Sequence, residues 1–126
     1  MLNLLIVEDN QLMRDLIRSM ISDLAGEVTE CGDGAEALTA YTSCRPDWVL
    51  MDIRMKDMDG ISATRQIKAS FPDAQIMIVT DYDNQSMREA ARNAGACEYV
   101  TKENLLDVRR ILSSSPGTLP KGDTSC

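Results

Sequence analysis

Five short strand-like segments, separated by helix-like stretches, constrain how this chain can fold. Residues 4–7, 49–51 and 76–79 are apolar throughout, as strands buried on both faces of a parallel sheet are. Residues 28–31 alternate between apolar and polar side chains, and residues 97–100 do so loosely, which is typical of edge strands. Because crossovers are right-handed and connections short, the pattern predicts an α/β fold. We expect a doubly wound, five-stranded parallel sheet in the order 2-1-3-4-5 with helices on both faces.

The stretches between these segments carry helix signals. Asn10 is placed to cap a helix over residues 11–24, and Gly26 is placed to end it. Four more helices are predicted, at about residues 35–43, 61–70, 84–94 and 104–112. Strands and helices therefore alternate five times, which predicts a flavodoxin-like (βα)5 unit.

The composition indicates one domain followed by a different kind of segment. We predict a folded domain over residues 1–113 and a flexible tail or linker stub over residues 114–126, which is rich in Ser, Pro and Gly. No apolar run approaches the roughly 20 residues of a membrane span. The first residues lack a secretion signal, so we expect a cytoplasmic protein that does not contact a membrane.

Charge and histidine content exclude several functions. The net charge of −7 argues against nucleic acid binding through this domain. Histidine is absent, which removes histidine catalysis and ordinary zinc sites.

Four of the predicted strands end beside a residue that can handle a phosphoryl group. Glu8 and Asp9 follow the first strand, Asp52 follows the third, Thr80 ends the fourth, and Lys102 follows the fifth. These strand ends meet along one edge of a parallel sheet, where ligands bind. Magnesium prefers oxygen ligands such as carboxylates, and a carboxylate such as Asp52 can attack phosphorus. The pattern predicts a Mg²⁺ site beside a phosphorylated aspartate, with the Lys102 ammonium and the Thr80 hydroxyl as partners of the phosphoryl oxygens.

These residues resemble the receiver domain of bacterial two-component response regulators. The resemblance extends from residue 4 to about residue 112 and is carried, in chain order, by LLIVEDN, WVLMDIRMKDMDG, IMIVT and GACEYVTK. The stretch TDYDNQSMREAARNAGACEYVTKENL is most similar to receivers of LuxR-type transcription regulators.

The resemblance implies a role for each acidic position. Asp52 corresponds to the phosphoacceptor, Asp9 to the direct magnesium ligand and Glu8 to the second acidic residue. The backbone carbonyl of Arg54 would complete the metal site.

The resemblance also implies a switch and its partners. Thr80 and Tyr99 correspond to the switch pair, and Lys102 to the lysine of the family. A histidine kinase or a histidine phosphotransfer protein would donate the phosphoryl group. The switched surface would bind a second copy or an effector protein. Such a chain is not an enzyme, beyond its own phosphoryl transfer and autodephosphorylation.

Other functions remain open from the sequence. The chain could be the N-terminal regulatory half of a DNA-binding transcription regulator, since residues 114–126 suit a linker. Aspartate-nucleophile phosphohydrolases usually place a second Asp two residues after the nucleophile, where Arg54 stands here. A receiver that only docks partners is the third alternative, and the complete acidic set argues against it.

Overall fold

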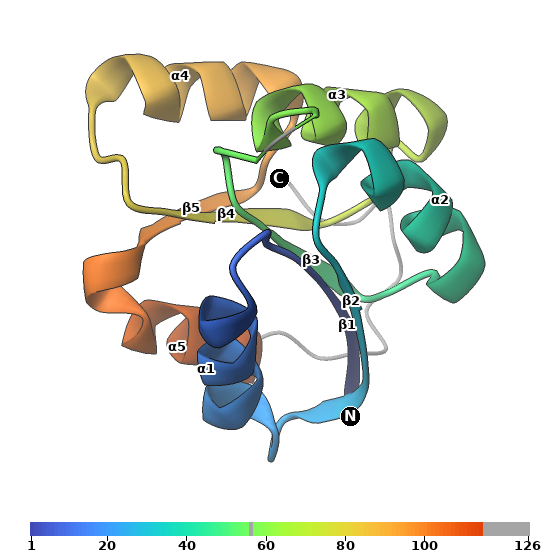
Figure 1. Cartoon of the computed structure of the whole chain (residues 1–126), viewed down its shortest axis with the longest axis vertical. Coiled ribbons are helices and arrows are strands. Elements are labelled where there is room, and N and C mark those ends of the chain that lie inside the picture. The colour runs from blue at the N-terminus through green and yellow to red at the C-terminus, as the bar shows by residue number, and fades with distance from the viewer. Residues whose placement is uncertain (56, 115–126) are drawn as a thin grey trace.

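A computed structural model describes residues 1–55 and 57–114 of the chain. Its centre is a five-stranded sheet (Figure 1) composed of β1 (Leu2–Val7), β2 (Ala25–Cys31), β3 (Trp48–Met51), β4 (Ile76–Thr80) and β5 (Glu98–Thr101). All neighbouring strands are parallel, and their order is β2-β1-β3-β4-β5. The predicted fold class and strand order are confirmed.

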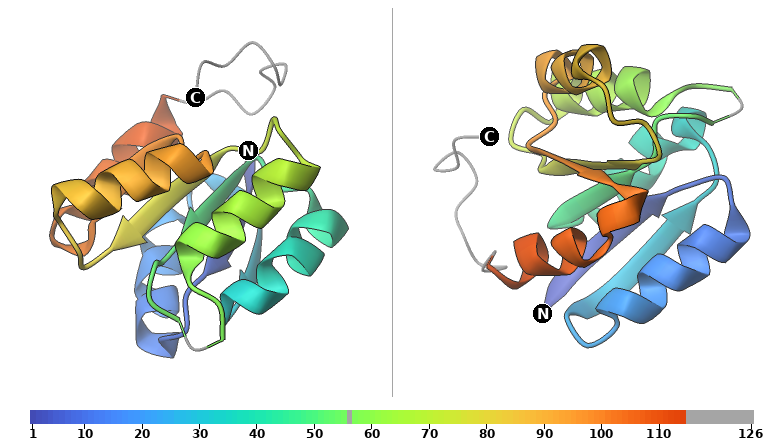
Figure 2. Two further views of the ribbon diagram at one scale, coloured as in Figure 1. Left: turned by 90° about the horizontal axis from the view of Figure 1, so that it is seen from above. Right: turned by 90° about the vertical axis from the view of Figure 1, so that its left-hand side faces the viewer.

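Helices cover both faces of the sheet. They are α1 (Gln11–Ile21), α2 (Gly34–Cys44), α3 (Gly60–Ser70), α4 (Gln85–Ala94) and α5 (Leu106–Ser113), with a 3₁₀ turn, η1 (Lys102–Asn104), before α5. Figures 1 and 2 show α1 and α5 on one face and α2, α3 and α4 on the other. This is the doubly wound arrangement, in which the strand ends remain open at one edge of the sheet.

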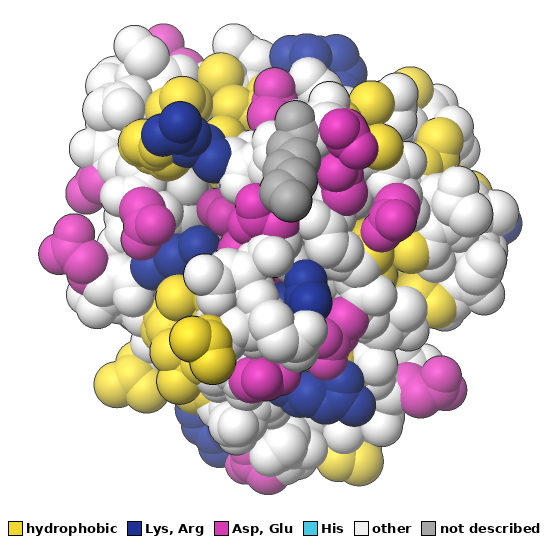
Figure 3. Space-filling model, in the orientation of Figure 1, with side chains coloured by type: hydrophobic (Ala, Val, Ile, Leu, Met, Phe, Trp, Pro, Cys, Tyr) yellow, Lys and Arg dark blue, Asp and Glu magenta, His cyan; other side chains and the backbone are white. Residues whose placement is uncertain are grey.

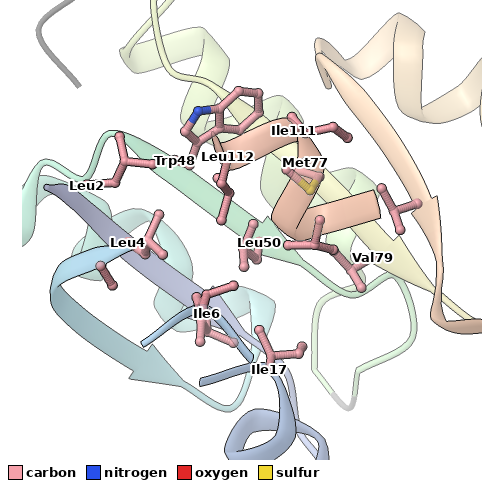
Figure 4. Packing of buried hydrophobic residues seen from close by; sticks show 14 residues of the cluster. Leu2, Leu4, Ile6, Ile17, Trp48, Leu50, Met77, Val79, Ile111 and Leu112 are labelled. Atoms are coloured by element: carbon pink, nitrogen blue, oxygen red, sulfur yellow. The ribbon is translucent and has the colours of Figure 1, made fainter. Parts of the chain in front are cut away.

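Alternate residues of the central strands enter two separate cores. Leu4 and Ile6 of β1 pack into the core beneath α1 and α5, whereas Leu5 and Val7 pack into the core beneath α2, α3 and α4. Figure 4 shows the first of these cores, where side chains of β1, β3 and β4 meet Ile17 of α1 and Leu112 of α5. Since both faces of each central strand are covered, these strands carry no polar alternation.

The first helix ends earlier than its sequence suggests. Asn10 does cap it, because its side chain accepts a hydrogen bond from the Met13 amide at 3.0 Å. However, α1 ends at Ile21, and the prediction of Gly26 as its stop was wrong, since Gly26 lies inside β2. Pairing with β1 extends β2 to include residues 25–27. This pairing is a long-range contact, so the local helix signals could not predict it.

Two sequence predictions meet the limits of the described residues. Within residues 1–55 and 57–114, no helix combines the length and apolarity needed to cross a bilayer. Nearly all of the predicted tail at 114–126 lies outside the described residues, so the boundary after residue 113 stays a prediction.

Candidate functional site

Three carboxylates gather where β1 and β3 end. Glu8 and Asp9 directly follow β1, and Asp52 follows β3. The two strands pair directly, so these strand ends are neighbours. One carboxylate oxygen from each residue lies within 4.8 Å of the others. In Figure 3, acidic side chains gather near the centre of the face, where Figure 1 shows β1 ending. The structure therefore brings together the acids that the sequence placed on separate strands.

Glu8 is buried although its side chain is a carboxyl group. Only 2 % of this residue is exposed. Its Oε1 lies 2.8 Å from Nζ of Lys102, and its Oε2 accepts a hydrogen bond from the Asn10 amide at 3.1 Å. Lys102 follows β5 immediately, so it reaches Glu8 across the sheet edge. The contact places the predicted lysine in the acidic site.

Asp52 is also buried, with 7 % of the residue exposed. Its Oδ1 accepts a hydrogen bond from the Ile53 amide at 2.8 Å, and its Oδ2 lies 3.4 Å from Nζ of Lys102. Asp9, by contrast, is exposed. The site therefore has a deep part formed by Glu8 and Asp52, and an outer part formed by Asp9.

The buried charges change each other's protonation. Burial is the main cause that raises the pKa of Glu8 to about 7. The hydrogen bond from Lys102 lowers this pKa, and the negative charge of Asp52 raises it further. Burial also raises the pKa of Asp52, although the charge of Lys102 opposes it. Burial lowers the pKa of Lys102, but Glu8 and Asp52 outweigh it, so the net shift is upward. The Lys102 ammonium thus contacts two carboxylates, those of Glu8 and Asp52, while Asp9 lies beside them. A divalent cation would offset the remaining negative charge.

We expect the metal-free protein to lose stability as the pH rises from about 4.5 to about 7. Glu8 has a folded-state pKa of about 7, above the ordinary value of 4.5, so the folded state binds more protons in this window and rising pH favours unfolding. Asp52 acts in the same direction. The Glu8 shift corresponds to at most about 3 kcal/mol. Asp23 and Asp33 have lowered pKa values and titrate below this window.

Thermal unfolding in the presence of a chelator, compared between about pH 5 and about pH 8, measures this loss. The matched control is Glu8→Gln, which cannot ionise and should show a much weaker decline. Equal pH dependence in both proteins would show that Glu8 is not the group responsible.

Thr80 and Tyr99, the predicted switch pair, lie on the neighbouring strands β4 and β5. Thr80 is fully buried, and its Oγ1 accepts a hydrogen bond from the Tyr82 amide at 3.4 Å. Tyr99 is half-buried, and its hydroxyl donates to the Tyr82 carbonyl at 2.6 Å. The guanidinium of Arg88 lies 4.6 Å from the centre of the Tyr99 ring. Both switch residues therefore contact the backbone of one loop residue, Tyr82.

Arg54 lies at the rim of the site with its side chain exposed. Its guanidinium donates a hydrogen bond to the Tyr82 hydroxyl and lies 5.4 Å from the centre of the Tyr82 ring. This contact joins the loop after β3 to the loop after β4. The metal-binding role of the Arg54 carbonyl stays a prediction.

Sequence reasoning missed one residue that shapes the site, Arg14, which contacts the backbone carbonyl of Glu8. This contact has no sequence signal, because it depends on how the loop after β1 turns into α1.

Comparisons with known proteins agree with this geometry. The family model of the response regulator receiver domain matches residues 4–113. The chemotaxis protein CheY of Listeria monocytogenes is 38% identical over 103 residues, which cover 81% of this chain and 87% of that protein. The chain belongs to the response regulator receiver family. It is a receiver of phosphorylation-based two-component signalling, and these matches do not favour the alternative of a regulatory half of a DNA-binding regulator.

Solved structures support the same family. A LuxR-family two-component response regulator from Aurantimonas is 31% identical with a TM-score of 0.79, and the match covers 89% of this chain and 85% of that one. The receiver domain of a sensor histidine kinase from Pseudomonas aeruginosa is 34% identical with a TM-score of 0.80, covering 89% and 94%. That receiver is described with a magnesium ion coordinated in its active site cleft. The predicted similarity to LuxR-type receivers is confirmed among these neighbours.

Proposed function

We propose that Asp52 accepts a phosphoryl group from a histidine kinase or a histidine phosphotransfer protein. The supporting observation is the environment of its carboxylate: Oδ1 is oriented by the Ile53 amide, and Oδ2 faces Lys102 at 3.4 Å. A carboxylate oxygen of Asp52 attacks phosphorus, the bond from phosphorus to the donor imidazole nitrogen breaks, and that nitrogen keeps the electron pair. Lys102 then binds an oxygen of the transferred group as a point charge.

The acidic cluster fits Mg²⁺. Magnesium takes oxygen ligands at about 2.1 Å in an octahedron, so ligands on opposite sides lie about 4 Å apart. The oxygens of Glu8, Asp9 and Asp52 lie within 4.8 Å of one another, which is close to this spacing. We propose that these three residues and the backbone carbonyl of Arg54 hold the ion. When bound, it neutralises negative charge between the carboxylates and the incoming phosphoryl group.

Thr80 and Tyr99 are the proposed switch. In the unphosphorylated protein, the Thr80 hydroxyl accepts a hydrogen bond from the Tyr82 amide. On phosphorylation it turns towards a phosphoryl oxygen, and that hydrogen bond breaks. Because Tyr99 donates to the carbonyl of Tyr82, movement of this loop also releases the Tyr99 ring. The face of α4, β5 and α5 then changes and binds a second copy or an effector protein. A shift of the two states from 1:99 to 99:1 needs a preference of about 5.5 kcal/mol.

The proposal includes no turnover of a separate substrate. A phosphohydrolase of the aspartate type needs a second acid near the nucleophile, but the residue two positions after Asp52 is Arg54. Its guanidinium is engaged by Tyr82 and cannot act as that acid. We infer that the chain transfers only the phosphoryl group that it carries, including its release to water.

The test uses the full chain, Mg²⁺ and a small phosphodonor such as acetyl phosphate. Intact-mass measurement should show one phosphoryl adduct, and borohydride trapping followed by peptide mapping should locate it at Asp52. The adduct should be absent when a chelator replaces Mg²⁺. An adduct at another residue, or no adduct with the phosphodonor and Mg²⁺, contradicts the proposal. Size-exclusion chromatography of the same samples tests whether the phosphorylated chain dimerises.

A further inference from the structure

A largely buried arginine connects the acidic loop after β1 to the edge strand β2. Arg14 lies near the start of α1, and its side chain is only 16% exposed, compared with 51% for Arg18. Its Nη1 donates to the backbone carbonyl of Glu8, and its Nε lies 3.1 Å from Oε1 of Glu30 in β2. A guanidinium can hold both partners at once because its donors form a rigid planar fork.

The carbonyl that Arg14 contacts belongs to the peptide that joins Glu8 to Asp9. The amide of Glu8 donates to the Cys31 carbonyl at 3.0 Å, and its carboxylate accepts from the Asn10 amide. The bond from Arg14 fixes the third polar group of Glu8 and thereby the plane of the following peptide. This plane sets the direction in which the Asp9 side chain leaves the backbone. Since Asp9 is exposed, packing contributes little to its orientation.

The surrounding chain leaves space for this guanidinium. A Cβ added at Gly32 would lie 3.2 Å from Nη1 of Arg14, which is tighter than an ordinary contact. On its other side, Glu30 also pairs with Arg18, whose side chain is 51% exposed. Arg14 and Arg18 therefore share one carboxylate, but Arg14 is the one of the two for which the structure shows a bond to Glu8.

We propose that Arg14 is a positioning residue that orients Glu8 and Asp9 for Mg²⁺. The inference rests on the proposed function, because it requires magnesium at this site. Residues that orient metal ligands typically change metal affinity about 10- to 100-fold when mutated. Arg14→Ala should therefore weaken magnesium binding by about 10-fold or more. Arg18→Ala also removes a partner of Glu30 and should change the affinity by less than about twofold.

The experiment is a magnesium titration of the full chain, followed by the amide signals in two-dimensional NMR. It compares the wild type with Arg14→Ala, Arg14→Lys and the matched control Arg18→Ala. Thermal unfolding in chelator measures the metal-free stability of each protein. Arg14→Lys should also bind magnesium more weakly than the wild type, because an ammonium lacks the rigid planar fork that holds the Glu8 and Glu30 contacts in a fixed geometry.

The outcomes separate positioning from simple stabilisation. A purely structural role would lower the metal-free unfolding temperature and leave the magnesium dissociation constant unchanged, which would overturn the inference. Equal weakening by Arg18→Ala and Arg14→Ala would also overturn it. If Arg14→Ala does not fold, wild-type affinity in Arg14→Lys overturns the inference instead. A wild type that does not bind magnesium contradicts the proposed function itself, whereas normal wild-type binding with unchanged variants contradicts only the role of Arg14.

Discussion

Replacing Gly60 by alanine is expected to remove a large part of the stability of the folded protein. A Cβ at this position would lie 1.8 Å from the backbone carbonyl oxygen of Asp52 and 2.8 Å from its carbonyl carbon. The clash is with backbone, so no side-chain rotation relieves it. The amide of Gly60 also donates to the Ile53 carbonyl at 2.7 Å, which fixes the start of α3 against the end of β3. We expect the free energy of unfolding to fall by more than about 4 kcal/mol. This is a large part of the total for an ordinary domain, which is about 5–15 kcal/mol.

Urea unfolding followed by circular dichroism measures this loss. The matched control is Gly26→Ala on β2, where the nearest atom to an added Cβ is the Asn3 side-chain oxygen at 3.0 Å. That side chain can move, so we expect a change within about 1 kcal/mol. A Gly60→Ala protein as stable as the control would mean that α3 can shift away from Asp52 without cost.

The sequence was sufficient for the parts of the site that depend on strand order. Glu8 and Asp52 could be placed together because each follows an uninterrupted apolar strand, and two such strands are adjacent in a doubly wound sheet. The same reasoning placed Lys102 at the shared edge, where it contacts both acids. Strand burial can be predicted from the sequence because it appears as an uninterrupted apolar run. Strand order can be predicted because the rules for connections between strands leave few arrangements.

Features that depend on close approach between elements were not predictable. Gly60 reads as an ordinary residue before a helix. The Asp52 backbone occupies the place where its Cβ would lie, and this follows only from the path of the loop between β3 and α3. Arg14 reads as one of the polar positions of an amphipathic helix, since neither Glu8 nor Glu30 lies at helical spacing from it. Gly26 gave a wrong helix end for the same reason, because pairing with β1 outweighed a local signal.

The electrostatics of the site also required the structure. A sequence shows three acids and a lysine, but not that Glu8 is the most deeply buried of them. Its raised pKa of about 7 results from this depth and from the distance to Asp52. Such repulsion between neighbouring carboxylates is expected at sites that bind a cation. Charges that repel one another in the metal-free protein are those that a bound divalent ion stabilises.

Asp52→Asn should abolish the phosphoryl adduct while the protein stays folded. The side-chain amide has nearly the shape of the carboxylate, and its oxygen can still accept the hydrogen bond that Ile53 donates. It lacks the negative charge and the nucleophilic oxygen, so attack on phosphorus stops. With a small phosphodonor and Mg²⁺, intact-mass measurement should find no adduct. The matched control is Asp57→Asn, the same substitution at an exposed position in the following loop, which should be phosphorylated like the wild type.

Asp52→Asn should also reduce the loss of stability that the metal-free protein shows as the pH rises. The charge of Asp52 helps to raise the pKa of Glu8, so its removal should bring that pKa down towards the ordinary value. Less repulsion then remains in the folded state at about pH 8, and the pH-dependent loss of stability should become smaller. Thermal unfolding in chelator measures this change.

An Asp52→Asn protein that still gains a phosphoryl group at the wild-type rate would assign the acceptor to another residue. Loss of the adduct together with a smaller pH-dependent loss of stability would show that one carboxylate is both the nucleophile and a source of the repulsion that magnesium relieves.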